Sequence, residues 1–207
     1  MPNVSNVKSK FFGAVDALDA DGISVAATIG SATTLTLGGT LTSGGSYTSG
    51  DNIGQLVTIL SAADDSGITF TVVGTNAVGD ALTEVVTGAS GAPGTATSSG
   101  YFNTVTSITT SAATAGNVSA GVTATGTGTV FAGRTRIRGL QGLSGASAGN
   151  LLFKNTSVTG TTLLTVPTQA AAELIEPYIP DNAVLFDAGA YVNFGSAVAT
   201  VTVFYDG

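Results

Sequence analysis

Residues 68–87 read ITFTVVGTNAVGDALTEVVT, and this stretch decides the fold class. Val, Ile, Thr and Phe dominate Ile68–Val73 and Leu82–Thr87, and the two runs are separated by a turn signal at Gly79-Asp80. β-branched and aromatic side chains fit the half-buried, pleated surface of a strand, whereas their stiff side chains lose freedom in a helix. The stretch therefore predicts two β-strands joined by a turn.

The same pattern continues on both sides of this stretch. From Gly22 to Phe131, short Val-, Ile- and Thr-rich runs alternate with Gly, Ser, Asn and Asp, a spacing typical of an antiparallel sandwich or barrel. No long segment keeps apolar residues at the three- and four-residue spacing of a helix. The further strands predicted in this region are Ile23–Ile29, Thr33–Leu37, Leu56–Leu60, Phe102–Thr109, Val118–Thr125 and Thr129–Phe131.

From Arg134 onward the predicted strands carry more Leu, Phe and Tyr, which indicates a second small β-domain. Residues 169–176 are predicted to form one or two helical turns that end at Pro177. The Gly-, Ala- and Ser-rich patches 88–100 and 140–149 are predicted to be long loops. The strands predicted in this region are Arg134–Leu140, Leu151–Lys154, Thr162–Val166, Val184–Asp187, Ala190–Phe194 and Val198–Tyr205.

These patterns predict an all-β protein with two antiparallel β-sandwich or jelly-roll-like domains and a short N-terminal arm. The expected divisions are an arm at residues 1–21, a β-sandwich domain at 22–132 and a C-terminal β-domain at 133–207. The arm is polar and contains both N-terminal lysines, and such leads are usually disordered when nothing holds them.

The composition removes most catalytic chemistry. None of the 207 residues is His or Cys, so a Ser-His-Asp triad, a thiolate nucleophile and the commonest metal ligand are all excluded. We therefore expect no enzyme activity, no cofactor and no metal site. The lack of Cys also excludes disulfides and fits a protein made in a reducing cytosol.

Charge and hydropathy limit the partners. A net charge of −7 disfavours nucleic acid, which a chain without a concentrated basic surface would repel. No stretch approaches about 20 uninterrupted apolar residues, so neither a transmembrane helix nor a membrane partner is expected. The N-terminal segment also lacks the apolar core of a signal peptide.

Two acidic patterns resemble known sites without completing them. Asp16, Asp19 and Asp21 precede a glycine as in a calcium loop, but the EF-hand alignment puts alanine in the first ligand position and threonine in the last. The carboxylate pairs at positions 64–65 and 173/176 could serve a glycosidase. Because the first lies in a Ser-Gly turn signal and the second adjoins a proline, structural roles are favoured for both.

Two features are candidates for a protein interface. Phe11 and Phe12 are adjacent apolar side chains in the polar arm, and they are expected to pack either on their own domain or on a neighbouring subunit. Arg134, Arg136 and Arg138 alternate with uncharged residues, so a strand would project all three guanidinium groups from one face.

The arginine face has two interpretations. It could grip carboxylates of a partner or sister subunit by bidentate pairing. Alternatively, it is an exposed face with local acidic partners such as Glu173, Glu176 or Asp187. The sequence leaves both interpretations open.

The segments Gly67–Asn76, Ala81–Val86 and Tyr101–Ile108 resemble the β-rich virion proteins of tailed bacteriophages. Ala183–Val192 and Val201–Tyr205 look like the end domain of similar phage proteins. The resemblance implies a structural component of the particle. It favours a capsid decoration or cement protein over a tail, neck or fibre component. It brings no catalytic residues to this chain.

The expected function is therefore to bind and stabilise the major capsid shell within the virion, after assembly in the host cytoplasm. The expected partners are the major capsid protein or other virion subunits and further copies of the chain, with a trimer favoured, because symmetric contacts can cover exposed sheet edges. A carbohydrate-binding β-sandwich is an alternative from another class, for which Tyr47, Tyr101 and Tyr178 in predicted loops could form an aromatic platform.

Overall fold

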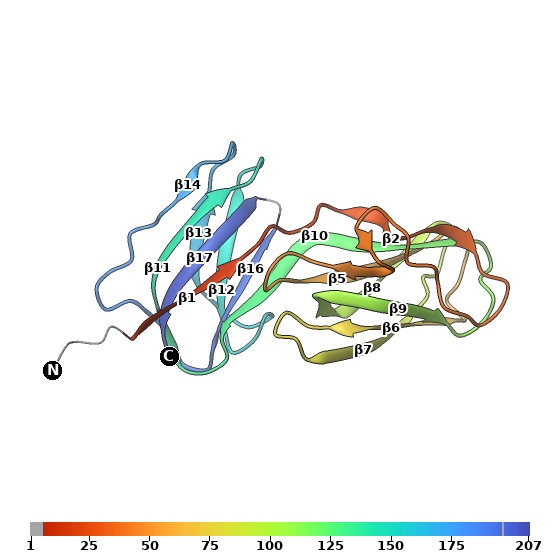
Figure 1. The fold of residues 1–207 in the computed structure, drawn as a ribbon, viewed down its shortest axis with the longest axis horizontal. Helices are drawn as coiled ribbons and strands as arrows, with labels where there is room; N and C mark the ends of the chain where they lie inside the picture. The colour runs from red at the N-terminus through yellow and green to blue at the C-terminus, as the bar shows by residue number, and fades with distance from the viewer. Residues whose placement is uncertain (1–5, 196) are drawn as a thin grey trace. The chain divides into compact units, whose positions relative to one another are not determined.

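The computed structural model describes residues 6–195 and 197–207, and this part of the chain is all-β, without helices. Its strands form antiparallel sheets, as the sequence predicts (Figure 1). No helix in these two ranges is long and apolar enough to span a membrane. The fold class predicted from the sequence is confirmed at this level.

The chain divides into two compact units. The central unit comprises Asp16–Ala124, and the flanking unit combines Met1–Val15 with Thr125–Gly207. The sequence instead predicts divisions after residues 21 and 132, so the contacts divide the chain earlier at both places. The first five residues of the predicted arm lie outside the described residues.

The strands are distributed between the two units. Strand β10 (Asn117–Phe131) contributes its first part to the central unit and its second part to the flanking unit. The other strands of the central unit are β2 (Asp19–Thr28), β3 (Thr42–Ser43), β4 (Ser46–Thr48), β5 (Gly54–Ser61), β6 (Thr69–Thr75), β7 (Ala81–Thr87), β8 (Gly94–Phe102) and β9 (Thr104–Thr110). Those of the flanking unit are β1 (Val7–Phe12), β11 (Thr135–Ser144), β12 (Gly149–Asn155), β13 (Thr162–Thr168), β14 (Leu174–Ile175), β15 (Val184–Phe186), β16 (Ala190–Gly195) and β17 (Val198–Asp206).

In the central unit, one sheet has the order β3-β4-β9-β6-β7, and strands β2, β10, β5 and β8 are consecutive neighbours in a second. The stretch that decides the fold class forms β6 and β7, which pair with each other through their whole length. Every second residue of β6 is buried, and Phe70 and Val72 join a core cluster to which both sheets contribute. Alternating burial of this kind is what the period-two pattern predicts.

A buried polar cluster lies inside the central unit. Gln55 on β5 is fully buried, and its amide donates to the main-chain oxygens of Asp16 at 3.1 Å and Thr123 at 2.6 Å. Its Oε1 accepts from the Asp16 main-chain N–H and the Ser49 hydroxyl, both at 3.0 Å. The Tyr47 hydroxyl lies within bonding distance of Gln55 Oε1 and of the Asp16 carboxylate. One side chain thus holds three segments of the unit together.

We expect the buried Tyr47 hydroxyl to make the stability of the protein fall at alkaline pH. Burial, followed by the nearby Asp16 carboxylate, raises the pKa of Tyr47 far above its ordinary value of 10.0. Above pH 10 the unfolded chain releases this proton while the folded chain keeps it, so stability should fall by about 1.4 kcal/mol per pH unit from this group. Urea unfolding of the wild type and Tyr47→Phe between pH 8 and pH 12 measures the effect. The wild type should lose stability more steeply, and parallel curves would contradict the assignment.

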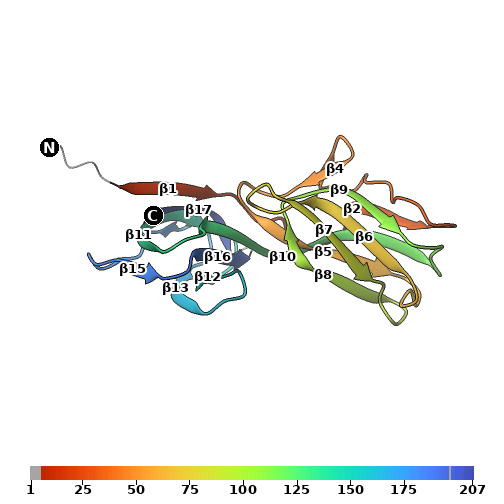
Figure 2. The same ribbon diagram turned by 90° about the horizontal axis from the view of Figure 1, so that it is seen from below.

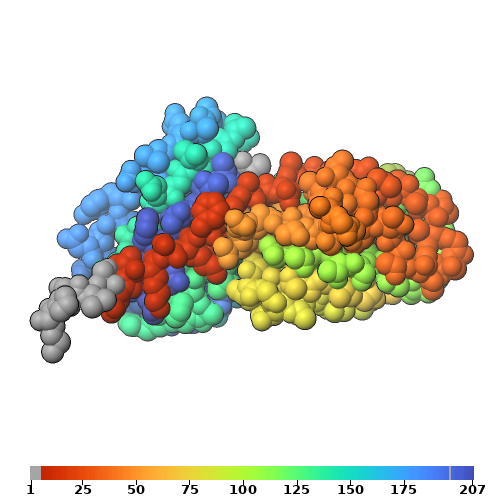
Figure 3. All heavy atoms as spheres, in the orientation of Figure 1, coloured from red at the N-terminus to blue at the C-terminus, as the bar shows by residue number. Residues whose placement is uncertain are grey.

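The flanking unit contains the sheet β1-β17-β11-β14, with β15 also paired to β11, and the neighbouring strands β13-β12-β16-β10 of the second sheet. Strand β1 pairs antiparallel with β17, from Val7 opposite Asp206 to Phe12 opposite Val201 (Figure 2). In the space-filling view β1 lies at the surface beside β17 (Figure 3). Residues 7–12 of the predicted arm are therefore a strand of this unit rather than a disordered lead.

The helical turns predicted at residues 169–176 are wrong. Ala171 and Ala172 adopt positive φ angles of 81° and 54°, which a right-handed helix does not allow. The residues that follow form β14, where Leu174 pairs with Leu143 of β11 and Ile175 is buried. Pairing with an existing sheet and burial of Ile175 override the weak local helical preference.

The two long loops predicted from composition are also corrected. Strand β8 begins inside the first patch, at Gly94, and is held by pairing with β5 from Thr58 to Ser61. Strand β11 continues to Ser144 within the second patch, which leaves residues 145–148 as the connection to β12. Main-chain pairing needs no particular side chain, so Gly- and Ser-rich segments form strands where a neighbouring strand offers its edge.

Smaller differences concern the other predicted strands. Thr33–Leu37 forms no extended strand and contributes one isolated bridge, between Thr34 and Thr109. The two strands predicted between Val118 and Phe131 are one continuous strand, β10.

Candidate functional site

Both predicted interface features lie in the flanking unit, on the sheet that contains β1 and β11. Phe11 and Phe12 are neighbours on β1, so their side chains point to opposite faces. Phe12 is fully buried, whereas Phe11 is 43% exposed. Packing within the protein's own unit therefore accounts for Phe12, and Phe11 is the one of the two that is accessible.

The exposed face of this sheet carries several apolar side chains among polar ones. Phe11 lies opposite Thr202 on β17, and Phe204 is two residues further along that strand, on the same face. Leu143 on β11 is on this face too, opposite Thr200, and pairs with Leu174 on β14. Val7, Leu143 and Leu174 are 47%, 45% and 59% exposed. We call Val7, Phe11, Leu143, Leu174 and Phe204 the apolar face.

The three arginines lie at one end of the same sheet, around the start of β11. Arg134 precedes the strand, and Arg136 and Arg138 are within it, with a register shift between Ile137 and Gly139. Such a bulge turns the strand locally and re-aims its side chains. Regular alternation through all three arginines, which the sequence predicts, is therefore interrupted at Arg138.

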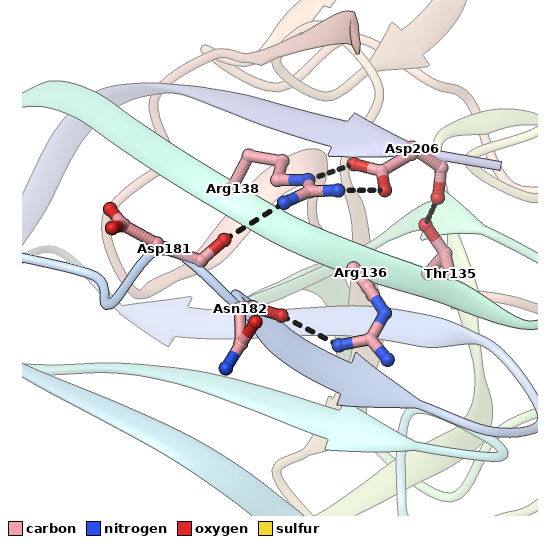
Figure 4. A network of polar contacts seen from close by, with 6 residues as sticks. All are labelled: Thr135, Arg136, Arg138, Asp181, Asn182 and Asp206. Carbon is pink, nitrogen blue, oxygen red and sulfur yellow. Dashed lines mark hydrogen bonds and ion pairs between the residues drawn. The ribbon is translucent and has the colours of Figure 1, made fainter. Parts of the chain in front are cut away.

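Arg138 is engaged within its own unit. Its Nε and Nη2 donate to the two carboxylate oxygens of Asp206 at 2.5 and 2.8 Å, and its Nη1 donates to the main-chain oxygen of Asp181 at 3.0 Å (Figure 4). The hydrogen bond from Arg138 holds the pKa of Asp206 below its ordinary value. The main-chain oxygen of Asp206 accepts a further hydrogen bond from the Thr135 hydroxyl.

Arg134 and Arg136 are less firmly held. Arg134 forms a 3.8 Å ion pair with Asp187, and the two side chains are 65% and 74% exposed. Arg136 donates from Nη1 to the main-chain oxygen of Asn182 at 2.6 Å (Figure 4). Of the local acidic partners predicted for the arginines, Asp187 is confirmed, and the described ion pairs involve neither Glu173 nor Glu176.

The two N-terminal lysines lie on β1. Lys8 Nζ donates to the main-chain oxygen of Gly207 at 2.6 Å and lies 5.7 Å from the centre of the Phe131 ring. Lys10 Nζ lies 6.0 Å from the centre of the Phe12 ring, and its burial lowers the pKa of Lys10. Lys8 is therefore the exposed lysine of the pair.

The charges are divided unequally between the two units. All six basic residues belong to the flanking unit, together with five acidic residues, which gives this unit a formal charge of +1. The central unit has eight acidic residues and no basic one, a formal charge of −8. This separation of charge is visible in the sequence, because residues 11–133 contain no Lys or Arg. The spacing of the three arginines alone does not reveal it.

Asp19 and Asp64, from the two acidic patterns of the sequence, accept hydrogen bonds from nearby residues. The Asp19 carboxylate accepts hydrogen bonds from the Asp21 main-chain N–H and the Thr40 hydroxyl, which lower the pKa of Asp19. Asp64 caps its turn by accepting from the main-chain N–H and the hydroxyl of Ser66. In residues 6–195 and 197–207, no group of three or more Asp or Glu side chains is placed to hold a metal ion.

The tyrosines suggested for a carbohydrate platform have different environments. Tyr47 lies on β4 and is fully buried, and Tyr101 is half-buried on β8. Tyr178 is 86% exposed in a loop of the flanking unit. The loop prediction is wrong for Tyr47 and Tyr101, and of the three tyrosines Tyr178 has the exposed ring.

No protein-family model, curated protein or solved structure that was compared with the chain matches it.

Proposed function

We propose that the protein is a structural component of a tailed-phage particle, specifically a decoration protein that binds and stabilises the capsid shell. Its place is then the virion, assembled in the host cytoplasm, with the major capsid protein and further copies of the chain as partners. The resemblance of several segments within residues 67–207 to β-rich virion proteins motivates this proposal. We also propose that the chain forms a homo-oligomer, with a trimer favoured.

The fold supports a binding role. We propose that each unit is a β-sandwich, because in each one strands from two antiparallel sheets surround buried apolar side chains. Such rigid frames present surfaces without large rearrangement, which suits a protein that binds an assembled lattice.

The apolar face is the observation that carries the proposal. Val7, Phe11, Leu143 and Leu174 expose between 43% and 59% of their surface on one sheet. Clusters of exposed apolar side chains mark protein–protein contact sites, whereas single exposed apolar residues are ordinary. We propose that this face lies against the shell.

Charge introduced into the apolar face should weaken shell binding. For Phe11→Asp we expect the affinity for empty shells of the encoding phage to fall by about tenfold or more. Burying a fully exposed Phe contributes about 1.5–3 kcal/mol, and Phe11 has 43% of its surface left to bury. The lost apolar contact and the burial of an unpaired carboxylate together account for the roughly 1.4 kcal/mol of a tenfold change. Co-sedimentation of the purified chain with shells measures the affinity.

Val85→Asp is the matched control, since Val85 is 61% exposed on β7 of the central unit. It should bind as the wild type does. If the wild type, Phe11→Asp and Val85→Asp bind shells equally well, the apolar face does not contact the shell. Binding of the wild type to purified tails instead of shells would place the chain in the tail, neck or fibre class.

A further inference from the structure

We propose that the basic cluster of the flanking unit, formed by Arg134 and Arg136, binds the acidic central unit of a second copy of this chain. The contact joins two unlike surfaces, so each copy offers one of each. This inference rests on the oligomerisation included in the proposed function, and not on shell binding.

The central unit contains no basic side chain of its own. Its eight carboxylates have no Lys, Arg or His within Asp16–Ala124, so no side-chain ion pair can neutralise them inside the unit. Asp21, Asp51, Asp64 and Asp80 are exposed. A unit whose charged side chains all have one sign attracts a partner of the opposite sign and repels nucleic acid.

The flanking unit offers the matching groups. Arg136 makes its described hydrogen bond to a main-chain oxygen, so one of five guanidinium N–H donors is used there. The ion pair of Arg134 with Asp187 is long and exposed, and such pairs contribute little. Both arginines can therefore take up carboxylates of another molecule without losing a strong contact.

The surface between these arginines is hollowed. A concavity of about 220 Å³ is lined by Arg134, Thr135, Arg136, Leu185, Asp206 and Gly207. Asp206 is the carboxylate in this lining, and both of its oxygens are bonded to Arg138. An incoming Asp or Glu side chain therefore meets Arg134 and Arg136 as donors, with the local acid already satisfied.

Contact between unlike surfaces has a geometric consequence. Repetition of the same contact closes a ring when the rotation allows it and otherwise continues as a filament. A closed ring of three copies is one such arrangement, so this contact is compatible with the trimer proposed above.

The test is sedimentation-velocity measurement of the full chain in 20 mM and 500 mM NaCl. At 500 mM the Debye length falls to about 4 Å, so association driven by these charges should weaken. We expect Arg136→Glu to raise the dissociation constant by about tenfold or more at low salt. Lys154→Glu is the control, because it makes the same charge change on β12, in the other sheet of the same unit.

Charge exchange identifies the acidic side. Asp21→Lys, Asp51→Lys or Asp80→Lys, each combined with Arg136→Glu in one chain, should restore association where the pair is in contact. A chain that is monomeric at low salt, or Arg136→Glu and Lys154→Glu variants that associate equally, would overturn the inference. A monomeric chain that still binds shells would refute this inference alone, whereas an associating chain that ignores shells would refute the decoration role alone.

Discussion

Replacing Phe12 by alanine is expected to lower the free energy of unfolding by about 3–5 kcal/mol, the usual cost of removing a fully buried Phe. The ring lies on the buried side of β1, where the strand pairs Phe12 with Val201 of β17. Its removal leaves a cavity beneath the strand that attaches residues 7–12 to the flanking unit. Urea unfolding followed by far-UV circular dichroism measures the loss.

Phe11→Ala is the matched control, because it removes the same side chain one position away. Phe11 is 43% exposed, so less surface returns to water and no closed cavity forms. We expect a loss of about 1 kcal/mol or less. Equal losses for the two variants would mean that β1 does not pack as described.

Replacing Gln55 by leucine is the second large effect we expect, a loss of about 3–5 kcal/mol. Leucine has a similar volume but leaves the Asp16 main-chain N–H, the Ser49 hydroxyl and the Thr123 main-chain oxygen without this partner. Each buried polar group that loses its hydrogen bond costs about 1–3 kcal/mol. Thermal and urea unfolding of the purified variant measure the change.

Gln169→Leu is the control for this prediction. Gln169 is exposed in the flanking unit, so the same chemical change should alter stability by about 0.5 kcal/mol or less. A Gln55→Leu variant as stable as this control would show that water or a shifted neighbour replaces the lost hydrogen bonds.

The sequence predicts strands well where side chains themselves favour them. Strands β6 and β7 appear within one or two residues of their expected bounds, because Val, Thr and Phe alternate there. Strands β1, β8 and β14 are missed, since their sequences are lysine-rich, Gly/Ser-rich or very short. These three strands form because they pair with β17, β5 and β11, respectively. Pairing between segments far apart in the chain leaves no pattern in the local sequence.

The candidate surface is foreseen in part. The sequence identifies the arginines and Phe11, but the bidentate partner of Arg138 is Asp206, 68 residues away. That pairing follows from the register of β11 and β17, which the bulge between Ile137 and Gly139 shifts. The apolar face has the same origin, because it combines residues from four strands that are neighbours only in the sheet.

The pairing of β1 with β17 also determines when the apolar face is completed during synthesis. The central unit is one continuous segment and can fold as soon as it leaves the ribosome, whereas Lys8 and Gly207 are 199 residues apart. Until β17 is made, β1 has no neighbouring strand and Arg138 has no Asp206. We therefore expect nascent chains to lack a complete apolar face, which delays shell binding until β17 has been made and has paired with β1.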